Sequence, residues 1–275
     1  MFLTFLTVAV AVSWIAYIRR YFALPFRKFS GPALSIKDVI VSFLLFFGVY
    51  LFLGPTIMII LHKSPYLAER THVLASVVHF IAFILTVVCL FVYDLFQDHS
   101  TMLKIFKDPQ FPGNRSLKYD VLLGALTWLI ATPTVISFSQ LAEILTSMFA
   151  GNPETDQIAV EALKQSLSSP IALITILISI LLFAPILEEY LFRGVLQSWI
   201  RRKAGPIPAI FIAALAFALL HFSPRQDWTN IPLIVSLFTF GCYLGFVYEK
   251  SRSLFSPIVL HVTFNLISVM RIILN

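Results

Sequence analysis

Residues 174–200 read ITILISILLFAPILEEYLFRGVLQSWI. The run is almost wholly apolar, and it is longer than the roughly 20 residues that an α-helix needs to cross a bilayer. Three charged side chains nevertheless interrupt it, namely Glu188, Glu189 and Arg193. A charge inside a membrane costs free energy, so such residues are functional candidates by default.

The composition of the whole chain indicates an integral membrane protein. Of its 275 residues, 59% are hydrophobic and 12% are charged, whereas a soluble domain carries about 25% charged residues. The mean hydropathy of +0.88 agrees with this interpretation. The net charge of +6 therefore reflects loops beside anionic lipid headgroups, and we expect no nucleic-acid partner.

Apolar segments recur along the chain and predict its fold class. We predict an all-α, polytopic transmembrane helix bundle with about eight spans. The spans cover approximately residues 2–18, 39–61, 72–96, 119–145, 170–200, 207–223, 231–248 and 254–273. Between the fourth and fifth spans, residues 147–169 predict either a short amphipathic helix on the membrane surface or a plain connector.

Basic residues are concentrated in alternate loops, and this pattern sets the predicted orientation. The loops rich in Lys and Arg lie near residues 19–37, 104–118, 201–203 and 250–252. The positive-inside rule places these loops in the cytoplasm. We therefore predict a multi-pass protein of the plasma membrane with both termini outside.

The two adjacent glutamates are expected to have different surroundings. Glu189 and Arg193 are four residues apart, so they share one helix face and can pair. Glu188 points about 100° away from Glu189 around the helix axis. We expect Glu188 to face a cavity as a free carboxylate, which suits a general base.

Two further motifs place polar side chains in the later spans. FALLH, residues 217–221, ends at His221. HVTFN, residues 261–265, carries His261 and Asn265 four residues apart, on one helix face. Together with the glutamates, these residues form a constellation that has no simple structural explanation.

Hydrolysis is the chemistry that fits this constellation. It requires a base that activates water and donors that stabilise an oxyanion. We expect Glu188 and His221 to activate the water, and His261 and Asn265 to stabilise the oxyanion. Glu188, His221 and His261 could instead bind zinc, with water as a further ligand. We favour catalysis without a metal cofactor and keep zinc as the alternative.

Distances along the helices give an expected depth for this site. We counted residues from the basic loops at a rise of about 1.5 Å per residue. The count places the site in the inner half of the membrane, where we expect it to open toward the cytoplasm.

The motifs, in this order, resemble those of a known family of intramembrane proteases. EEYLFR resembles the family's EExxxR motif, FALLH its FxxxH motif and HVTFN its HxxxN motif. The family is the CPBP or Abi family of CaaX proteases and bacteriocin-processing proteins, which includes the type II CaaX prenyl endopeptidases. Arg252 stands where family members often have glycine.

The resemblance covers residues 170–268 and suggests a division of the chain. Residues 1–150 would form N-terminal transmembrane helices without recognised motifs, and residues 170–270 a catalytic transmembrane core. The expected partners are the lipid bilayer and a peptide or protein substrate, and the substrate class includes prenylated, CaaX-like proteins. The alternatives are a non-catalytic bacteriocin-immunity or membrane-binding protein and, less favoured, a transporter.

The resemblance also implies roles for individual residues in an intramembrane endopeptidase. The implied catalytic residues are Glu188, His221, His261 and Asn265, with Glu189 and Arg193 in support. Family members are described both as glutamate-type proteases and as metalloendopeptidases, so the question of a metal stays open here.

Overall fold

The computed structural model describes all residues except 1, 25–30, 109–115, 151–157 and 275. These described residues form helices and no β-strand, which confirms the predicted all-α class. The elements are α1 (Phe2–Ile18), α2 (Ile36–Gly48), η1 (Val49–Leu53), α3 (Gly54–His62), α4 (Pro65–Ala68), α5 (Thr71–Asp94), α6 (His99–Phe106), α7 (Leu117–Ala150), α8 (Ile158–Ser166), α9 (Pro170–Ile178), η2 (Ser179–Phe183), α10 (Ala184–Glu189), η3 (Tyr190–Gln197), α11 (Ser198–Ala204), α12 (Pro206–Leu220), η4 (Pro224–Thr229), α13 (Asn230–Ser251) and α14 (Phe255–Leu274). The segments η1, η2 and η3 are π-helical, and η4 is a 3₁₀-helix.

The eight predicted spans are all helical, but they differ in length. The stretches long and apolar enough to cross a bilayer are Ile36–His62, Thr71–Asp94, Leu117–Phe149, Pro170–Ala204, Pro224–Ser251 and Phe255–Leu274. The other two spans are the shorter apolar helices α1 and α12. At 15 residues, α12 is about 22 Å long, which is less than the ~30 Å hydrocarbon core of a bilayer.

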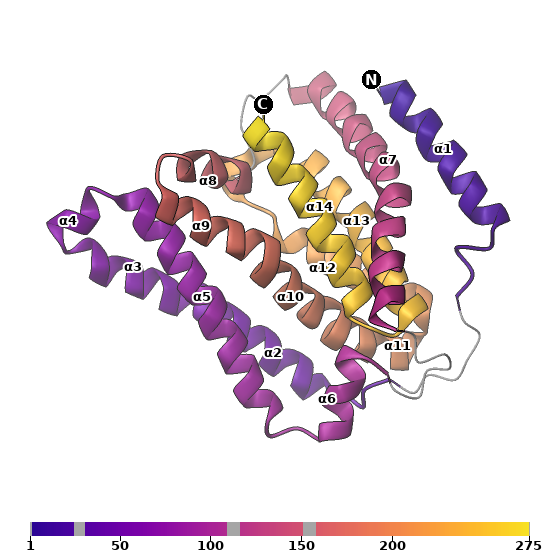
Figure 1. Ribbon diagram of the computed structural model, residues 1–275, viewed down its shortest axis with the longest axis horizontal. Coiled ribbons are helices and arrows are strands. Elements are labelled where there is room, and N and C mark those ends of the chain that lie inside the picture. Colours follow the sequence, from indigo (N-terminus) through magenta and orange to yellow (C-terminus); the bar gives the residue numbers. More distant parts are fainter. Residues whose placement is uncertain (1, 25–30, 109–115, 151–157, 275) are drawn as a thin grey trace.

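The bundle is built around α7 and α13. Helix α13 packs against both α7 and α12, while α1 and α14 also pack against α7. On the other flank, α5 packs against α9 (Figure 1). The start of α1, the end of α14 and α8 lie at one end of the bundle, which we call the α8 end; α6 and α11 lie at the other, which we call the α11 end (Figure 1).

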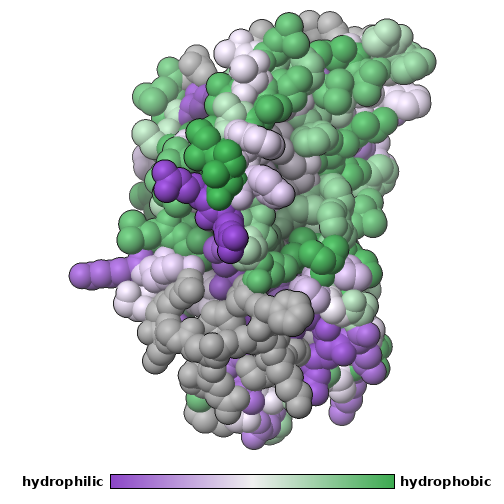
Figure 2. Space-filling model, turned by 90° about the vertical axis from the view of Figure 1, so that its right-hand side faces the viewer, coloured by the Kyte–Doolittle hydropathy of each residue, from purple (hydrophilic) through white to green (hydrophobic). Residues whose placement is uncertain are grey.

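The outer surface of the bundle is apolar, as lipid contact requires. Large hydrophobic side chains are exposed on many helices, for example Phe52, Leu122 and Phe211. Figure 2 shows hydrophobic side chains over most of the upper part of one face and hydrophilic ones gathered toward its lower end. Soluble monomers rarely expose such extended apolar surfaces, so the structure is that of an integral membrane protein.

A short helix, α8, occupies part of residues 147–169, for which the sequence predicts either an amphipathic helix or a plain connector. Part of its apolar side is packed: Leu163 is 1% exposed and lies in a small core with Ile176 and Val269, whereas Ile158 is exposed. The described part of this segment is therefore a helix docked on α9 and α14, and not a plain connector.

A glycine on α7 allows α14 to approach closely. A Cβ atom at Gly124 would lie 2.7 Å from the backbone oxygen of Ser256 and 2.9 Å from Cβ of Val259. Small residues permit this kind of backbone contact between membrane helices. Since α14 carries His261 and Asn265, the contact at Gly124 also sets the position of the third motif.

We expect Gly124→Ala to lower the stability of the protein, because the added methyl group must displace α14. Overpacking of this kind typically costs about 1–3 kcal/mol, and it would appear as a lower midpoint of thermal unfolding in detergent. Gly48→Ala is the matched control, because a Cβ there meets nothing within 4 Å. Equal midpoints for the two variants would show that the contact at Gly124 is not tight.

Candidate active site

One continuous helix carries the two glutamates and the arginine of the first motif. The elements from α9 to α11 follow one another without a break from Pro170 to Ala204. Glu188 and Glu189 end α10, a regular α-helical turn between the π-helical segments η2 and η3. Single π-helical turns inside α-helices are frequent at functional sites.

Glu189 is the centre of a buried charge cluster. Its Oε1 accepts hydrogen bonds from Nη1 of Arg193 (3.2 Å) and from Nδ1 of His261 (2.8 Å). The side chains of Glu189 and Arg193 are 0% exposed. Arg193 also donates through Nη2 to the backbone oxygen of Gly241 (3.2 Å). The ion pair that the four-residue spacing predicts is therefore present, and His261 joins it from α14.

Glu188 lies at the edge of this cluster and faces a cavity. Its side chain is 15% exposed and lines a cavity of about 410 Å³. Its Oε2 lies 3.7 Å from Nε2 of His261, which is beyond hydrogen-bonding distance. Two neighbouring glutamates thus have different surroundings, in the way that helix geometry predicts.

His221 reaches the cavity from the end of α12. The last carbonyl groups of a helix lack backbone partners, and the imidazole Nδ1 of His221 lies 3.0 Å from the oxygen of Phe217. Because a carbonyl oxygen only accepts, Nδ1 carries the hydrogen in this contact. In the neutral ring, the other nitrogen, Nε2, is then an acceptor.

Asn265 and His261 reach the same cavity from α14. The side-chain amide of Asn265 donates one hydrogen bond to the backbone oxygen of Ile180, at 3.0 Å. Ile180 belongs to the π-helical segment η2, so this bond ties α14 to a widened turn. An amide nitrogen has two hydrogens, and the second is available to another acceptor.

The structure therefore brings Glu188, His221, His261 and Asn265 to the wall of one cavity, with Glu189 and Arg193 directly behind it. Apolar side chains form most of the remaining described wall. They include Phe46, Phe83, Phe217, Leu237, Phe240 and Phe264. The catalytic roles of the polar residues stay a prediction at this point.

Three of the described residues that line the cavity are exposed. Among the described lining residues, His79, Ala159 and Ser268 are exposed, and the others are buried or half-buried. These three belong to α5, α8 and α14. The expected opening of the cavity toward the cytoplasm stays a prediction.

The described side chains do not form a metal site. No group of three or more His, Cys, Asp and Glu residues within the described ranges could hold a metal ion. Zinc binding by Glu188, His221 and His261 stays an alternative prediction, because these residues line the same cavity. His261 is also held by Glu189 through Nδ1, which fixes the direction of its ring.

Two aromatic residues hold the histidines, and the motif analysis gave them no role. Phe217 contacts both His221 and His261 edge-to-face, and Arg193 lies over its ring at 4.7 Å. Phe240 contacts His261 in the same way. The signal for Phe217 was present in the sequence, because it is the first residue of FALLH and shares a helix face with His221.

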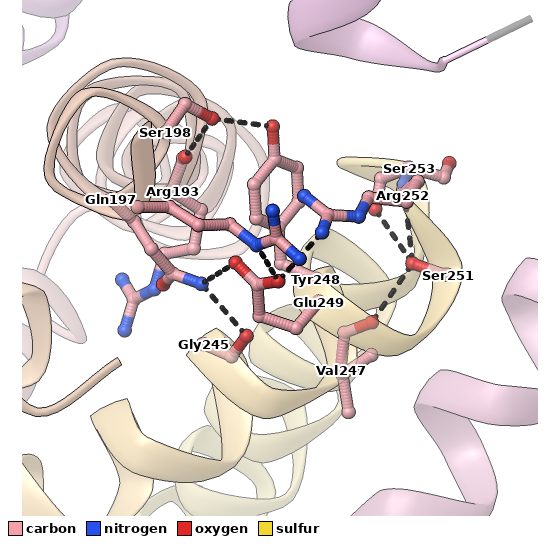
Figure 3. Close-up of polar contacts among 11 residues, drawn as sticks. Arg193, Gln197, Ser198, Gly245, Val247, Tyr248, Glu249, Ser251, Arg252 and Ser253 are labelled. Atoms are coloured by element: carbon pink, nitrogen blue, oxygen red, sulfur yellow. Dashed lines mark hydrogen bonds and ion pairs between the residues drawn. The ribbon is translucent and has the colours of Figure 1, made fainter. Parts of the chain in front are cut away.

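A ladder of polar contacts joins the motif helix to α13 below the cavity (Figure 3). Its contacts repeat every four residues along both helices: Arg193 with Gly241, Gln197 with Gly245, and Arg201 with Glu249. Gln197 also donates to Glu249 (3.2 Å), and its own side chain is fully buried. The sequence signal that could have indicated this ladder is a four-residue spacing. It separates Arg193 from Gln197, and Gly241 from Gly245.

Arg252 follows this ladder at the end of α13 and has an unusual backbone conformation. Its φ of 55° and ψ of 35° are left-handed, a conformation that costs most residues about 1–2 kcal/mol. This explains why glycine is frequent here in the family that the sequence resembles. In this chain the guanidinium offsets the cost through an ion pair with Glu249 at 2.9 Å.

Comparison with known proteins agrees with the geometry. Residues 170–267 match the family model described as "Type II CAAX prenyl endopeptidase Rce1-like". The resemblance is confirmed for this segment. The six motif residues lie within it, namely Glu188, Glu189, Arg193, His221, His261 and Asn265.

One curated relative shares part of this sequence. A Bacillus subtilis (strain 168) protein, described as "Uncharacterized protein YpbD", is 35% identical over 74 residues. The match covers 27% of this chain and 33% of that protein, so the chain spans about a third of the length of this relative. No solved structure matches the chain.

Proposed function

We propose that the protein is an intramembrane endopeptidase that hydrolyses a peptide bond of a membrane-associated substrate. The observation that carries the proposal is the cavity inside the helix bundle. Glu188, His221, His261 and Asn265 reach its wall from three separate helices. The segment that holds them matches a family of endopeptidases.

In this proposal, Glu188 and His221 activate the attacking water. Glu188 is the carboxylate at the cavity surface, and it accepts a proton from the attacking water as general base. His221 has its Nδ1 hydrogen on the oxygen of Phe217, so Nε2 can accept a hydrogen bond from the same water. Glu188 then returns the proton to the leaving amine.

His261 and Asn265 stabilise the oxyanion in this proposal. Glu189 fixes the ring of His261 through Nδ1, and Nε2 must carry a hydrogen to donate to the oxyanion. Asn265 can donate the amide hydrogen that Ile180 does not use. Fixed donors aimed at a developing charge need no reorganisation during the reaction, and each is worth roughly 10²–10³ in rate.

The orientation in the membrane is part of the proposal. Basic residues end the elements that meet at the α11 end, including Arg201, Arg202 and Lys203 in α11 and Lys104 in α6. The positive-inside rule favours this end as the cytoplasmic one. We therefore place the α8 end and both termini outside the plasma membrane.

A comparison of cell proteomes tests the function directly. Cells that produce the Glu188→Gln variant should accumulate uncut forms of the substrate, and cells with the native protein should contain new peptide termini in it. Identical sets of termini in the two cultures would contradict the proposal and favour a non-catalytic protein.

We expect cleavage to continue after treatment with a metal chelator, because the described residues do not gather a set of metal ligands. The measurement is the rate of substrate cleavage by purified protein before and after exhaustive dialysis against EDTA. Loss of cleavage that zinc restores would instead support the metalloendopeptidase alternative.

A further inference from the structure

A second hollow, which we call the α5 groove, lies between α5 and the helix that carries the glutamates. It has a volume of about 440 Å³, and its described wall is formed by residues of α5, the turn after it, α6, α10 and η3. No described residue lines both this groove and the cavity at Glu188. The α5 groove is therefore separate from the proposed catalytic site.

The groove is polar at one end and apolar along its length. Val87, Leu90 and Asp94 line it from one face of α5, at spacings of three and four residues. Asp94 is the last residue of a helix long enough to cross a bilayer, so its carboxylate lies near the level where lipid headgroups begin. Val87, one helical repeat earlier, lies about 10 Å deeper in the hydrocarbon.

The carboxylate of Asp94 has acceptor capacity left and no cationic partner. The hydroxyl oxygen of Tyr190 donates to it, at 2.7 Å from Oδ1 and 2.8 Å from Oδ2. A carboxylate has about four acceptor sites, and the single hydroxyl hydrogen leaves the others unused. In the part of the chain that the structure describes, no Lys, Arg or His forms an ion pair with Asp94. A half-buried charge without a partner costs free energy, and a bound cation would offset that cost.

From this shape and this charge we propose that the α5 groove binds a glycerophospholipid with a primary-amine headgroup. The ammonium group donates hydrogen bonds to Asp94 beside Tyr190, and one acyl chain lies along Leu90 and Val87. The apolar length of the groove favours a lipid over a soluble amine, which would leave that part unfilled. Because Tyr190 directly follows Glu189 in the sequence, the bound lipid holds the end of α5 against the helix of the first motif.

Native mass spectrometry of the full chain in detergent micelles tests the lipid preference. The probes are dioleoyl phosphatidylethanolamine and the phosphatidylcholine and phosphatidylglycerol with the same acyl chains. The choline headgroup has no N–H donor, and the glycerol headgroup leaves the lipid with a net negative charge. We expect the ethanolamine lipid to bind roughly 10- to 100-fold more tightly than either, the difference that a hydrogen bond to a charged group makes.

Two pairs of variants locate the binding site. Asp94→Asn should remove the preference for the ethanolamine lipid, because the amide keeps an acceptor for Tyr190 but carries no charge. Asp227→Asn is the matched control, at an exposed aspartate that does not line the groove. Val87→Trp should weaken binding of the ethanolamine lipid roughly tenfold or more, because the indole fills the groove. Val88→Trp should not, because its exposed neighbouring position does not line the groove.

Several results would overturn the proposal. They are equal binding of the three lipids, tighter binding of the glycerol lipid, an unchanged preference in Asp94→Asn, or unchanged binding in Val87→Trp. The thermal midpoint of each lipid-free variant shows whether it is folded. The comparison of lipids on the native protein needs no variant, and it does not depend on whether the protein cleaves peptides.

Discussion

Glu188→Gln is expected to reduce peptide cleavage by roughly 10²–10⁴-fold, the range that a general acid–base group contributes. The amide cannot accept the proton from water, although it keeps the size of the side chain. The folded structure should change little, because Glu188 lies at the cavity wall and its contact with Nε2 of His261 is long, at 3.7 Å. The measurement is the initial rate with the substrate identified from the proteome comparison.

The matched control for this variant is Glu161→Gln, a glutamate on the exposed side of α8. It should cleave at the native rate. A Glu188→Gln protein that retains native cleavage would remove Glu188 from the mechanism. A lower thermal midpoint in Glu188→Gln alone would instead indicate a structural role.

Arg193→Met is expected to destabilise the fold by about 3–5 kcal/mol, the usual cost of removing one partner of a buried ion pair. Glu189 would keep His261 as its remaining partner in the cluster, while its own side chain stays 0% exposed. The bond to the oxygen of Gly241 would be lost as well. The measurement is thermal or denaturant unfolding in detergent.

A double variant separates the charge effect from the loss of packing. Glu189→Leu combined with Arg193→Met removes both charges, and such replacements are often neutral or stabilising relative to a broken pair. We therefore expect the double variant to be more stable than Arg193→Met. Arg225→Met, at an exposed position, is the control for changing a single arginine. A double variant less stable than Arg193→Met would contradict a charge-based explanation.

Much of the fold was predictable because membrane helices follow a strong local rule. Each backbone polar group in lipid must be satisfied within its own segment, so a long apolar run predicts a helix. The eight expected segments are helical for this reason. The expected sixth segment, residues 207–223, extends three residues past the end of α12 at Leu220.

The cluster at Glu189 contains one contact that the sequence predicts and one that only the tertiary structure shows. Its ion pair with Arg193 could be predicted, because four residues bring two side chains together on any helix. Its bond to His261 could not, because 72 positions separate the two residues and their meeting depends on how α14 packs against the bundle.

The sequence by itself determined a helical membrane protein, the ion pair of Glu189 with Arg193, and three motifs in the order of a protease family. Only the tertiary structure decided that His261 joins Glu189 and that Glu188, His221 and Asn265 line one cavity with His261. The physical reason is that spacing along a helix reports directions around one axis. The distance between helices is set by side chains that fit against each other, such as Gly124 against Ser256 and Gln197 against Gly245.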